Sequence, residues 1–268
     1  VGPFLGPQAP VPSAAPLSAT MSTGPAFGQA DMTNCERELI QFAGSIQPHG
    51  LLLVLHEPQL RIVQASRSAG RWLGCPLDTL LLRELHELGG DASSRVRALC
   101  DAGDLLEPQP LRCNVGETVF EGALHRVGAD TLVLELEPVD PLPPMLHSVQ
   151  IDGTQLLRSL GMAVQRISEA ASIGVLTDGV VQQLRDIVGY DRVMVYRFDP
   201  DGHGKIIAEA SDPRLESLIG HRYPATDIPQ RARELYLRNR VRVLVDVHYE
   251  PSELLPQRPP GGGGPLGE

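Results

Sequence analysis

The pattern of apolar and polar positions separates a leader from a folded region. Residues 1–30 are rich in Pro, Ala, Gly and Ser and show no apolar periodicity, so we expect this leader to be disordered. At Gly50 the pattern changes. Residues 51–55 form a continuous apolar run, which is typical of a buried strand, and residues 61–65 predict a second strand after a turn at residues 56–59. The folded part is therefore predicted to begin with two consecutive strands.

Helices and two further strands follow in this first predicted unit. Residues 68–73 are expected to form a short helix, and the leucine-rich residues 77–88 add further helical or irregular chain. Apolar and polar residues then alternate through residues 119–127 and 131–137, which predicts two strands joined by a hairpin turn at residues 128–130. This order of elements favours a PAS-type sheet with helices on one face.

A proline-punctuated linker precedes a second predicted unit. Apolar residues recur at three- and four-residue steps from Leu156 to Ala171, which predicts an amphipathic helix. A second helix is expected to end at Gly189, and its apolar side is predicted to consist of Val181, Leu184, Ile187 and Val188. Strands are predicted at residues 192–198 and 205–210. Helices that lead into such a hairpin resemble the start of a GAF domain.

These elements predict an α+β fold of two domains, each a central antiparallel sheet flanked by helices. The chain is divided on this basis into a disordered leader at residues 1–30, an N-terminal extension and PAS domain at 31–138, a linker at 139–150, and a GAF domain at 151–268. Because a GAF domain needs further strands, we expect this one to be incomplete on its C-terminal side.

Charge and composition exclude two classes of partner. A net charge of -10 and an isoelectric point near 5.3 argue against a nucleic-acid-binding surface, which needs clustered Lys and Arg. The arginines between residues 231 and 242 are interpreted as a solvated helix face. No apolar run approaches the roughly 20 residues that span a bilayer, and the first residues do not resemble a secretion signal. We therefore expect a cytoplasmic protein without membrane contact.

The four cysteines lie far apart, without a C-x-x-C pair or a His at ligand spacing, so neither a metal site nor a disulfide framework is expected. Cys75, Cys100 and Cys113 are interpreted as small, partly buried apolar residues. Only Cys35, in the polar segment 31–38, lacks a role in a core. An exposed cysteine is a candidate nucleophile through its thiolate.

Local charge does not decide the reactivity of Cys35. Arg37 favours the thiolate, whereas Glu36 and Glu38 oppose it. A reaction at this thiol would therefore depend on proximity to its partner, because oriented attack gains more than a small pKa shift. From the residues alone, an incidental exposed cysteine remains the alternative.

A second candidate segment is Tyr223-Pro224-Ala225-Thr226-Asp227-Ile228-Pro229. Its prolines restrict the backbone, so the carboxylate and carbonyl of Asp227 are presented rigidly, which suits a cationic or N–H-rich ligand. The alternative is a helix start, in which Thr226 or Asp227 caps a helix over residues 230–239 and Pro229 occupies its first position. The two interpretations are compatible.

Together these segments resemble a known family. Residues 31–38, followed by Gly44-Ser45-Ile46-Gln47-Pro48-His49-Gly50, resemble the N-terminal extension of bacteriophytochromes, and residues 223–229 resemble their chromophore-pocket motif. The resemblance implies a red/far-red light photoreceptor that binds the linear tetrapyrrole biliverdin through a thioether to Cys35. Light would isomerise the bilin near its D ring, and altered contacts would carry the signal onward.

The resemblance also implies roles for individual residues. The carbonyl of Asp227 would face the pyrrole nitrogens and its side chain the signalling arm, while Ile46 would thread through a loop of the GAF domain as part of a knot. The aromatic residues around the D ring would be Tyr196 and Tyr223, and the apolar wall would consist of Met194 and Ile228. Tyr236 and Arg242 would hold a propionate, and Pro229 would complete the pocket motif. For Tyr196 and Met194, a role in the core remains the alternative. For Arg242, the alternative is a surface charge.

Partners and activity follow from the same resemblance. A homodimer and C-terminal signalling domains, such as a sensor histidine kinase, are expected, with further pocket residues beyond Glu268. This part of the protein is not expected to be an enzyme, apart from autocatalytic attachment of the bilin. The alternative function is a PAS-GAF ligand-sensing or protein-interaction module that binds no bilin.

Overall fold

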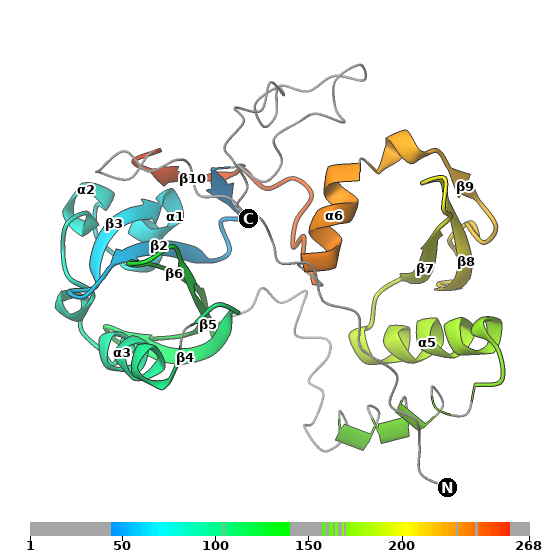
Figure 1. Cartoon of the computed structure of the whole chain (residues 1–268), viewed down its shortest axis with the longest axis horizontal. Coiled ribbons are helices and arrows are strands. Elements are labelled where there is room, and N and C mark those ends of the chain that lie inside the picture. Colours follow the sequence, from blue (N-terminus) through cyan, green and yellow to red (C-terminus); the bar gives the residue numbers. More distant parts are fainter. Residues whose placement is uncertain are drawn as a thin grey trace, which may run out of the picture.

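The computed structural model of the chain describes residues 44–103, 105–139, 170–228, 230–238 and 241–257, with short helical pieces between 157 and 168. Two antiparallel sheets, each with its own helices, organise these residues (Figure 1). In the described part of the chain, no helix has the length and apolar character that a membrane crossing requires. The same part contains no group of three or more His, Cys, Asp or Glu residues that could hold a metal ion.

The first sheet has seven strands, and its central pair forms as the apolar pattern predicts. The run at residues 51–55 lies in a strand that pairs with its neighbours on both sides, and all five of its residues are buried. The strands follow in the order β1 (Ser45–Ile46), β10 (Ser252–Leu255), β3 (Arg61–Ser66), β2 (Leu51–His56), β6 (Thr131–Pro138), β5 (Thr118–Val127) and β4 (Gln109–Val115). The four strands predicted from alternation or apolar runs are thereby confirmed.

Short helices and the main core adjoin this sheet. Alternate residues of β2 lie on opposite faces, so Leu51, Leu53 and Leu55 join the main core whereas Leu52 and Val54 join a second, smaller one. The helical segments that contribute to the main core are α1 (Arg67–Trp72), α2 (Leu77–Leu80), the 3-10 helix η3 (Leu85–Leu88) and α3 (Ala92–Ala102). The arrangement is the expected PAS-type sheet with helices.

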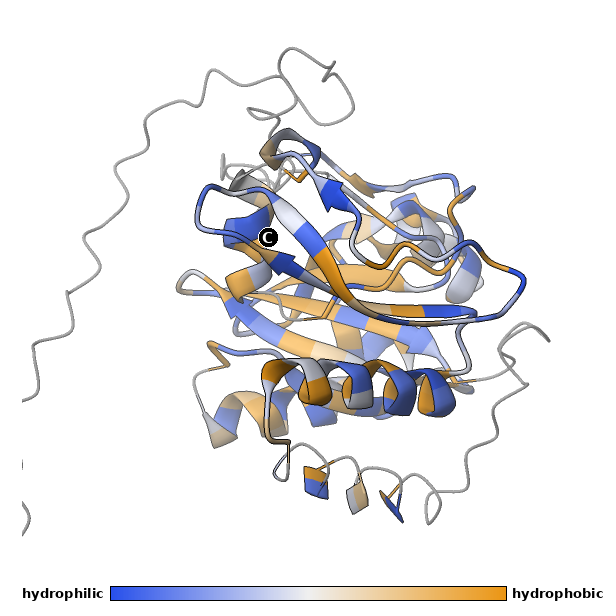
Figure 2. Ribbon diagram, turned by 90° about the vertical axis from the view of Figure 1, so that its right-hand side faces the viewer, coloured by the Kyte–Doolittle hydropathy of each residue, from blue (hydrophilic) through white to orange (hydrophobic). Residues whose placement is uncertain are grey.

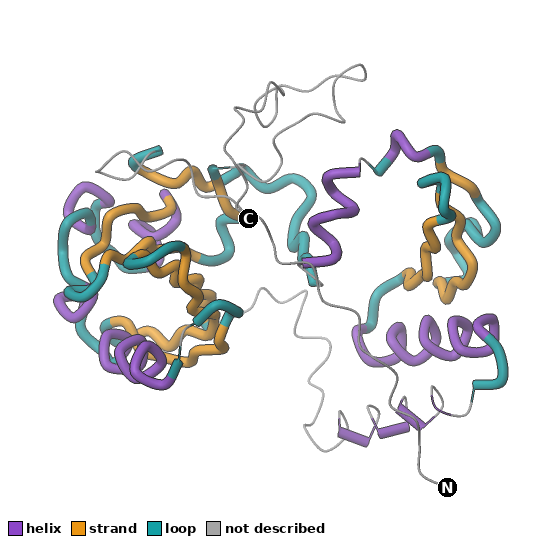
Figure 3. The backbone as a smooth tube through the Cα atoms, in the orientation of Figure 1, coloured by secondary structure: helices purple, strands orange, loops and turns teal. Residues whose placement is uncertain are grey.

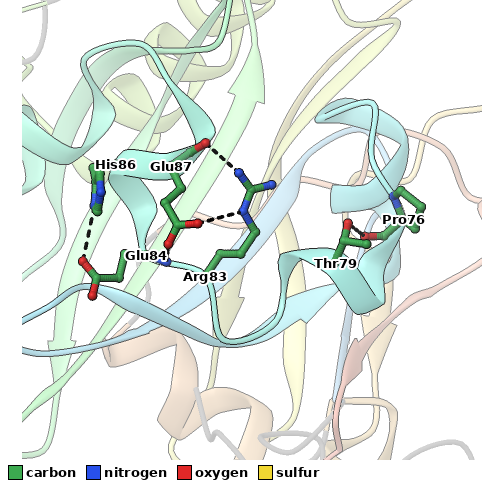
Figure 4. Close-up of polar contacts among 6 residues, drawn as sticks. All are labelled: Pro76, Thr79, Arg83, Glu84, His86 and Glu87. Atoms are coloured by element: carbon green, nitrogen blue, oxygen red, sulfur yellow. Dashed lines mark hydrogen bonds and ion pairs between the residues drawn. The ribbon is translucent and has the colours of Figure 1, made fainter.

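Local polar contacts fix the chain from the start of α2 to η3 (Figure 4). The backbone N–H of Glu84 donates to the Glu87 carboxylate over 2.9 Å, which completes a capping box at the start of η3. Arg83 donates to the Glu87 carbonyl over 2.7 Å, and the Thr79 hydroxyl donates to the Pro76 carbonyl over 2.7 Å. These bonds order a connection that contains little regular structure.

The second sheet consists of β7 (Arg192–Phe198), β8 (Gly204–Ser211) and β9 (Arg222–Tyr223), in that order. Helix α5 (Ile173–Val188) packs on one of its faces, where Val181 contacts the small residues Ala208 and Ala210. The predicted strands and the predicted end at Gly189, whose backbone is left-handed, are confirmed. In Figure 2, hydrophilic and hydrophobic residues alternate along the ribbon of this helix, as in an amphipathic helix.

The predicted apolar side of α5 is partly wrong. Leu184 and Val188 are 44% and 39% exposed, whereas Gln183 is only 8% exposed. Val181 packs on the sheet beside Ala208 and Ala210, whereas Leu184 and Val188 lie at positions of the helix that the described residues leave partly uncovered. The helix predicted over residues 156–171 lies largely outside the described residues.

Residues 241–257, here named the return segment, run from the end of α6 (Gln230–Arg238) back to the first sheet (Figure 3). Within this segment β10 pairs with β3 on one side and β1 on the other. Ser252 is buried there, and its hydroxyl accepts from the Ser68 backbone N–H over 2.7 Å. The threading expected for Ile46 stays a prediction, because it depends on residues before Gly44, which lie outside the described residues.

Candidate functional site

The candidate site is built on the face of the second sheet that lies opposite α5. Val193 and Val195 of β7 pack toward the core beneath α5. Because side chains alternate along a strand, Met194, Tyr196 and Phe198 lie on the other face. Met194 and Phe198 remain 41% and 39% exposed, so this face carries apolar surface that the described residues do not cover.

Three aromatic rings form the centre of this face. The rings of Tyr196 and Phe198 meet edge to face, with centroids 5.0 Å apart and an interplanar angle of 74°. The ring of Tyr223 on β9 lies 5.9 Å from that of Tyr196, tilted by 46°. Such distances and angles are those of favourable aromatic pairs. The structure thus brings together both tyrosines that the sequence predicted for the site.

The predicted pocket motif lies at one end of this aromatic cluster. Residues Ala225–Asp227 form the 3-10 helix η4, in which the Asp227 N–H donates to the Pro224 carbonyl over 3.1 Å. The Ala225 N–H donates to Nδ1 of His203, 3.1 Å away, which ties the motif to the turn between β7 and β8. Ile228 is half-buried, and Pro229 lies outside the described residues.

Asp227 and Tyr196 are close enough to interact electrostatically. Burial raises the pKa of the Tyr196 phenol, and the negative charge of Asp227 raises it further. The phenol therefore stays protonated and remains a hydrogen-bond donor at neutral pH. Asp227 is exposed, which leaves its carboxylate accessible beside the cluster.

Helix α6 adds a cation to the edge of the cluster. The Arg233 guanidinium lies 5.8 Å from the centre of the Phe198 ring, and its Nη1 donates to the Gly202 carbonyl over 3.2 Å. Its Nε is buried and has no hydrogen-bond partner among the described residues. A buried, unpartnered guanidinium N–H is a ready donor for a carboxylate.

The predicted propionate residues form a second pair on α6 and the return segment. The Arg242 guanidinium lies 5.6 Å from the centre of the Tyr236 ring. Tyr236 is 46% exposed, and Arg242 is also exposed. Cys35, the predicted attachment residue, lies outside the described residues, so its position relative to both groups stays a prediction.

Sequence reasoning missed Phe198 and Arg233. Phe198 comes two residues after Tyr196 in the same strand, so alternation alone would have placed both rings on one face. Arg233 precedes Tyr236 by three residues on one helix, a spacing that puts both side chains on neighbouring positions of the helix surface. Both signals were present in the sequence.

Comparison with known proteins identifies relatives over most of the chain. The family described as PAS fold matches residues 35–139. A bacteriophytochrome of Xanthomonas campestris pv. campestris (strain 8004) is 39% identical over 250 residues, which cover 92% of this chain and 38% of that protein. Cyanobacterial phytochrome B of Nostoc sp. (strain PCC 7120) is 36% identical over 243 residues, covering 89% of this chain and 31% of that protein. The chain thus spans less than two fifths of the length of these relatives.

A solved structure extends the likeness to the fold. The chromophore-binding domain of a bacteriophytochrome from R. palustris matches with a TM-score of 0.74 at 34% sequence identity. The match covers 87% of this chain and 74% of that chain, so it includes both sheets rather than the first alone. With agreement in sequence and in architecture over most of its length, the chain belongs to the bacteriophytochrome family.

Proposed function

We propose that this chain is the light-sensing part of a red/far-red photoreceptor and that it holds biliverdin through a thioether to Cys35. The aromatic cluster of Tyr196, Phe198 and Tyr223 is the observation that carries this proposal. It lies on a partly exposed apolar face beside the motif that resembles the family's chromophore pocket. The name of the R. palustris structure, a chromophore-binding domain, supports the same assignment.

The residues present fit a linear tetrapyrrole. A flat conjugated ligand packs well against aromatic rings and exposed apolar side chains, here Phe198 and Met194. Its two propionates need cationic partners. Arg233 borders the face and has a buried Nε without a partner among the described residues, and Arg242 lies beside Tyr236 of α6. Tyr236 would share the propionate contact with Arg242.

Attachment to Cys35 needs no oxidant. The thiol of Cys35 would add across a vinyl group of the bilin: Sγ would bond to one vinyl carbon, and the thiol proton would pass to the neighbouring carbon as the double bond is lost. The chromophore would supply visible absorption and the double bond that isomerises. Within the pocket, the carbonyl of Asp227 would accept from pyrrole N–H groups, while Tyr196 and Tyr223 would surround the isomerising ring. Met194 and Ile228 would form the apolar wall, with Pro229 as a further pocket residue.

The remaining features of the proposal concern the whole protein. The second unit would be a GAF domain following the PAS domain, within the boundaries given by the sequence. The protein would be a cytoplasmic homodimer in which downstream signalling domains, such as a sensor histidine kinase, respond to the chromophore. The part present here would perform no turnover, because attachment is a single event per chain.

The test is to mix the purified chain with biliverdin, record visible spectra before and after red light, and stain a denaturing gel with zinc. We expect a far-red band, light-induced bleaching and zinc fluorescence. Cys35→Ala should abolish the fluorescence, whereas the control Cys75→Ala should keep it. Asp227→Ala should keep attachment but impair photoconversion; normal photoconversion would contradict the role of Asp227.

A chain that shows no spectral change, and whose Cys35 is alkylated equally with and without biliverdin, would favour the ligand-sensing or interaction module instead. A longer chain, which also spans the rest of the length of the solved chromophore-binding domain, separates the two explanations. If that longer chain also fails to bind biliverdin, the photoreceptor proposal is wrong.

A further inference from the structure

The turn between β7 and β8 is held together by its own hydrogen bonds. The Asp199 N–H donates to the His203 carbonyl over 2.7 Å, and the Gly202 N–H donates to the Asp199 carbonyl over 2.9 Å. The Asp201 carboxylate accepts from the His203 N–H over 3.1 Å. Because the flanking strands also pair with each other, the backbone of residues 199–203 is fixed before anything else packs on it.

This turn contacts the chain on both sides of Asp227. Before Asp227, the Ala225 N–H donates to Nδ1 of His203 over 3.1 Å. After Asp227, Nη1 of Arg233 on α6 donates to the Gly202 carbonyl over 3.2 Å. A Cβ added at Gly202 would come within 3.3 Å of the Ala225 Cβ and 2.6 Å of Nη1 of Arg233, so the turn packs against both neighbours. The turn therefore supports the two segments between which Asp227 lies.

The bond from Ala225 to His203 depends on the protonation state of the imidazole. Ala225 is the first residue of η4, and the proline before it supplies no cap, so the His203 ring accepts from this N–H in place of a capping side chain. An imidazole nitrogen accepts only while it carries no proton, which requires the neutral ring with its proton on Nε2. A second proton, placed on Nδ1, would make this nitrogen a donor that faces another donor.

The groups around this contact leave histidine as the residue type that titrates near neutral pH. Carboxylates, tyrosines, lysines and arginines ordinarily change charge outside the range from pH 5 to pH 8, whereas histidine changes charge within it. Those of the turn, η4, β7, β8, β9 and α6 are Asp199, Asp201, Asp227, Tyr196, Arg197, Lys205, Arg222, Tyr223 and Arg233. A second histidine, His221, directly precedes β9 and serves below as a control.

We propose that His203 is a positioning residue of the chromophore pocket: its neutral imidazole holds η4, and with it the carbonyl of Asp227, and protonation of the ring releases η4. The inference rests on the proposed function, in which this carbonyl accepts from the pyrrole N–H groups. His203 acts through the backbone of η4 and needs no contact with the bilin. The bond is present above the pH range in which histidine titrates and is lost as the pH falls through that range.

The first test uses the chain without biliverdin. NMR measures the protection of the Ala225 N–H from hydrogen exchange, as the ratio of the intrinsic rate to the observed rate, at pH 7.5 and pH 5.5. In the unaltered chain, protection should fall roughly fivefold at the lower pH, because one hydrogen bond is lost. In His203→Asn, Oδ1 replaces Nδ1 as the acceptor and does not titrate, so protection should differ between the two pH values by less than about twofold.

Two further chains and one reference amide make the measurement specific. His203→Leu, which has no acceptor, should show the low protection at both pH values. His221→Asn should keep the pH response of the unaltered chain. The reference is the Ile206 N–H, which donates to the His221 carbonyl over 3.0 Å in the same sheet. Its protection should stay constant in the His203 variants, because the sheet does not depend on the ring of His203.

The second test measures biliverdin binding in a Cys35→Ala background, which keeps binding reversible. Since biliverdin has titratable groups of its own, chains are compared with one another at each pH. At pH 7.5 the chain with His203→Asn should bind within about twofold of the chain with His203, and at pH 5.5 it should bind roughly fivefold more tightly. His203→Leu should bind roughly fivefold more weakly at pH 7.5.

The outcomes separate the two proposals. If the unaltered chain binds no biliverdin, the proposed function fails, while exchange at Ala225 still decides whether His203 holds η4. If His203→Asn shows the same pH dependence of Ala225 protection as the unaltered chain, the positioning role is wrong. Loss of protection at Ile206 together with Ala225 would show that the whole sheet loosens, which would also overturn a specific role for His203.

Discussion

The ring of Tyr196 lies against the backbone of Gly204, so closely that a methyl group added at position 204 would come within 2.0 Å of Cζ. Gly204 begins β8 and pairs with Phe198, two residues beyond Tyr196 on β7. The absence of a side chain at position 204 is therefore what allows the central ring of the cluster to approach the backbone of β8 this closely. Any residue other than glycine must displace either the ring or the strand.

Gly204→Ala should destabilise the protein by about 1–3 kcal/mol, because the added methyl overpacks the site. The control is Gly179→Ala in α5, where an added Cβ meets nothing within 4 Å and alanine should stabilise the helix by roughly 0.5–1 kcal/mol. Urea denaturation would measure both changes. Equal effects of the two substitutions would contradict the close approach of Tyr196 to Gly204.

Ser252→Ala should release β10 from the first sheet. The substitution leaves the buried Ser68 N–H without the hydroxyl that it contacts at 2.7 Å, at a cost of about 1–3 kcal/mol. Hydrogen exchange at the Leu254 N–H, which donates to the Gly44 carbonyl, should become faster. Thr79→Ala removes an exposed hydroxyl bond of the same length and should leave this exchange unchanged.

Cys113 should resist alkylation in the folded protein. Burial, assisted by the charge of Asp91, raises the pKa of its thiol from 9.0 to about 11. At pH 8 its thiolate fraction is thus about a hundredfold smaller than that of an ordinary thiol, and the side chain is also 2% exposed. Mass spectrometry after iodoacetamide treatment should find Cys113 unmodified in native protein and modified in denaturant. Rapid native modification would contradict its buried position.

The same pKa predicts the direction of an alkaline effect. Because the folded state keeps the proton of Cys113 at pH values where the unfolded state has lost it, this group's contribution to stability is present below pH 9 and is lost as the pH rises toward 11. Cys113→Ala should therefore lose less stability than the unaltered chain between pH 9 and pH 11, as measured by urea midpoints. If both proteins lost the same stability between pH 9 and pH 11, groups other than Cys113 would control the alkaline unfolding.

Asp212 predicts an effect of the opposite sign at acid pH. Hydrogen bonds from the side chain and backbone of Arg214 lower the pKa of this carboxyl from 3.8 to about 2. A lowered pKa contributes stability above the unfolded value, and this contribution is lost as the pH falls from about 4 to 2. The urea midpoint of Asp212→Asn should lie below that of the unaltered chain at pH 6, and the difference should shrink toward pH 2. Asp178→Asn, at an exposed position of α5, serves as the control.

The pattern of apolar residues predicted the strands, because a strand in a sheet buries either every second side chain or all of them. The run at residues 51–55 lies between two other strands and is buried on both faces, so its apolar character was sufficient. The apolar side of α5 was harder to predict, since periodicity reveals a stripe but not the width of the surface that covers it. The burial of Gln183 and the exposure of Leu184 both depend on what packs against the helix, which the helix sequence does not encode.

The site was predicted less completely than the fold. Tyr196 and Tyr223 come from strands 27 residues apart, and their contact follows from pairing through β8 rather than from any local signal. A resemblance to family motifs was needed to select them. The hydrogen bonds of the Gln47 carboxamide with the backbone of Val243 and Val245 could not be predicted at all, because backbone groups carry no identity in a sequence.

The place of β10 has a consequence for the time course of synthesis. Arg67 and Glu253, which pair at 2.8 Å beside β3 and β10, are separated by 186 residues. At translation rates of roughly 5–20 residues per second, β3 leaves the ribosome about 10–40 s before the strand that covers its edge. During that interval the backbone of β3 presents unpaired groups that can recruit strands from other chains. We therefore expect the nascent protein to depend on protection of this edge, and expression to be most sensitive to aggregation before the return segment emerges.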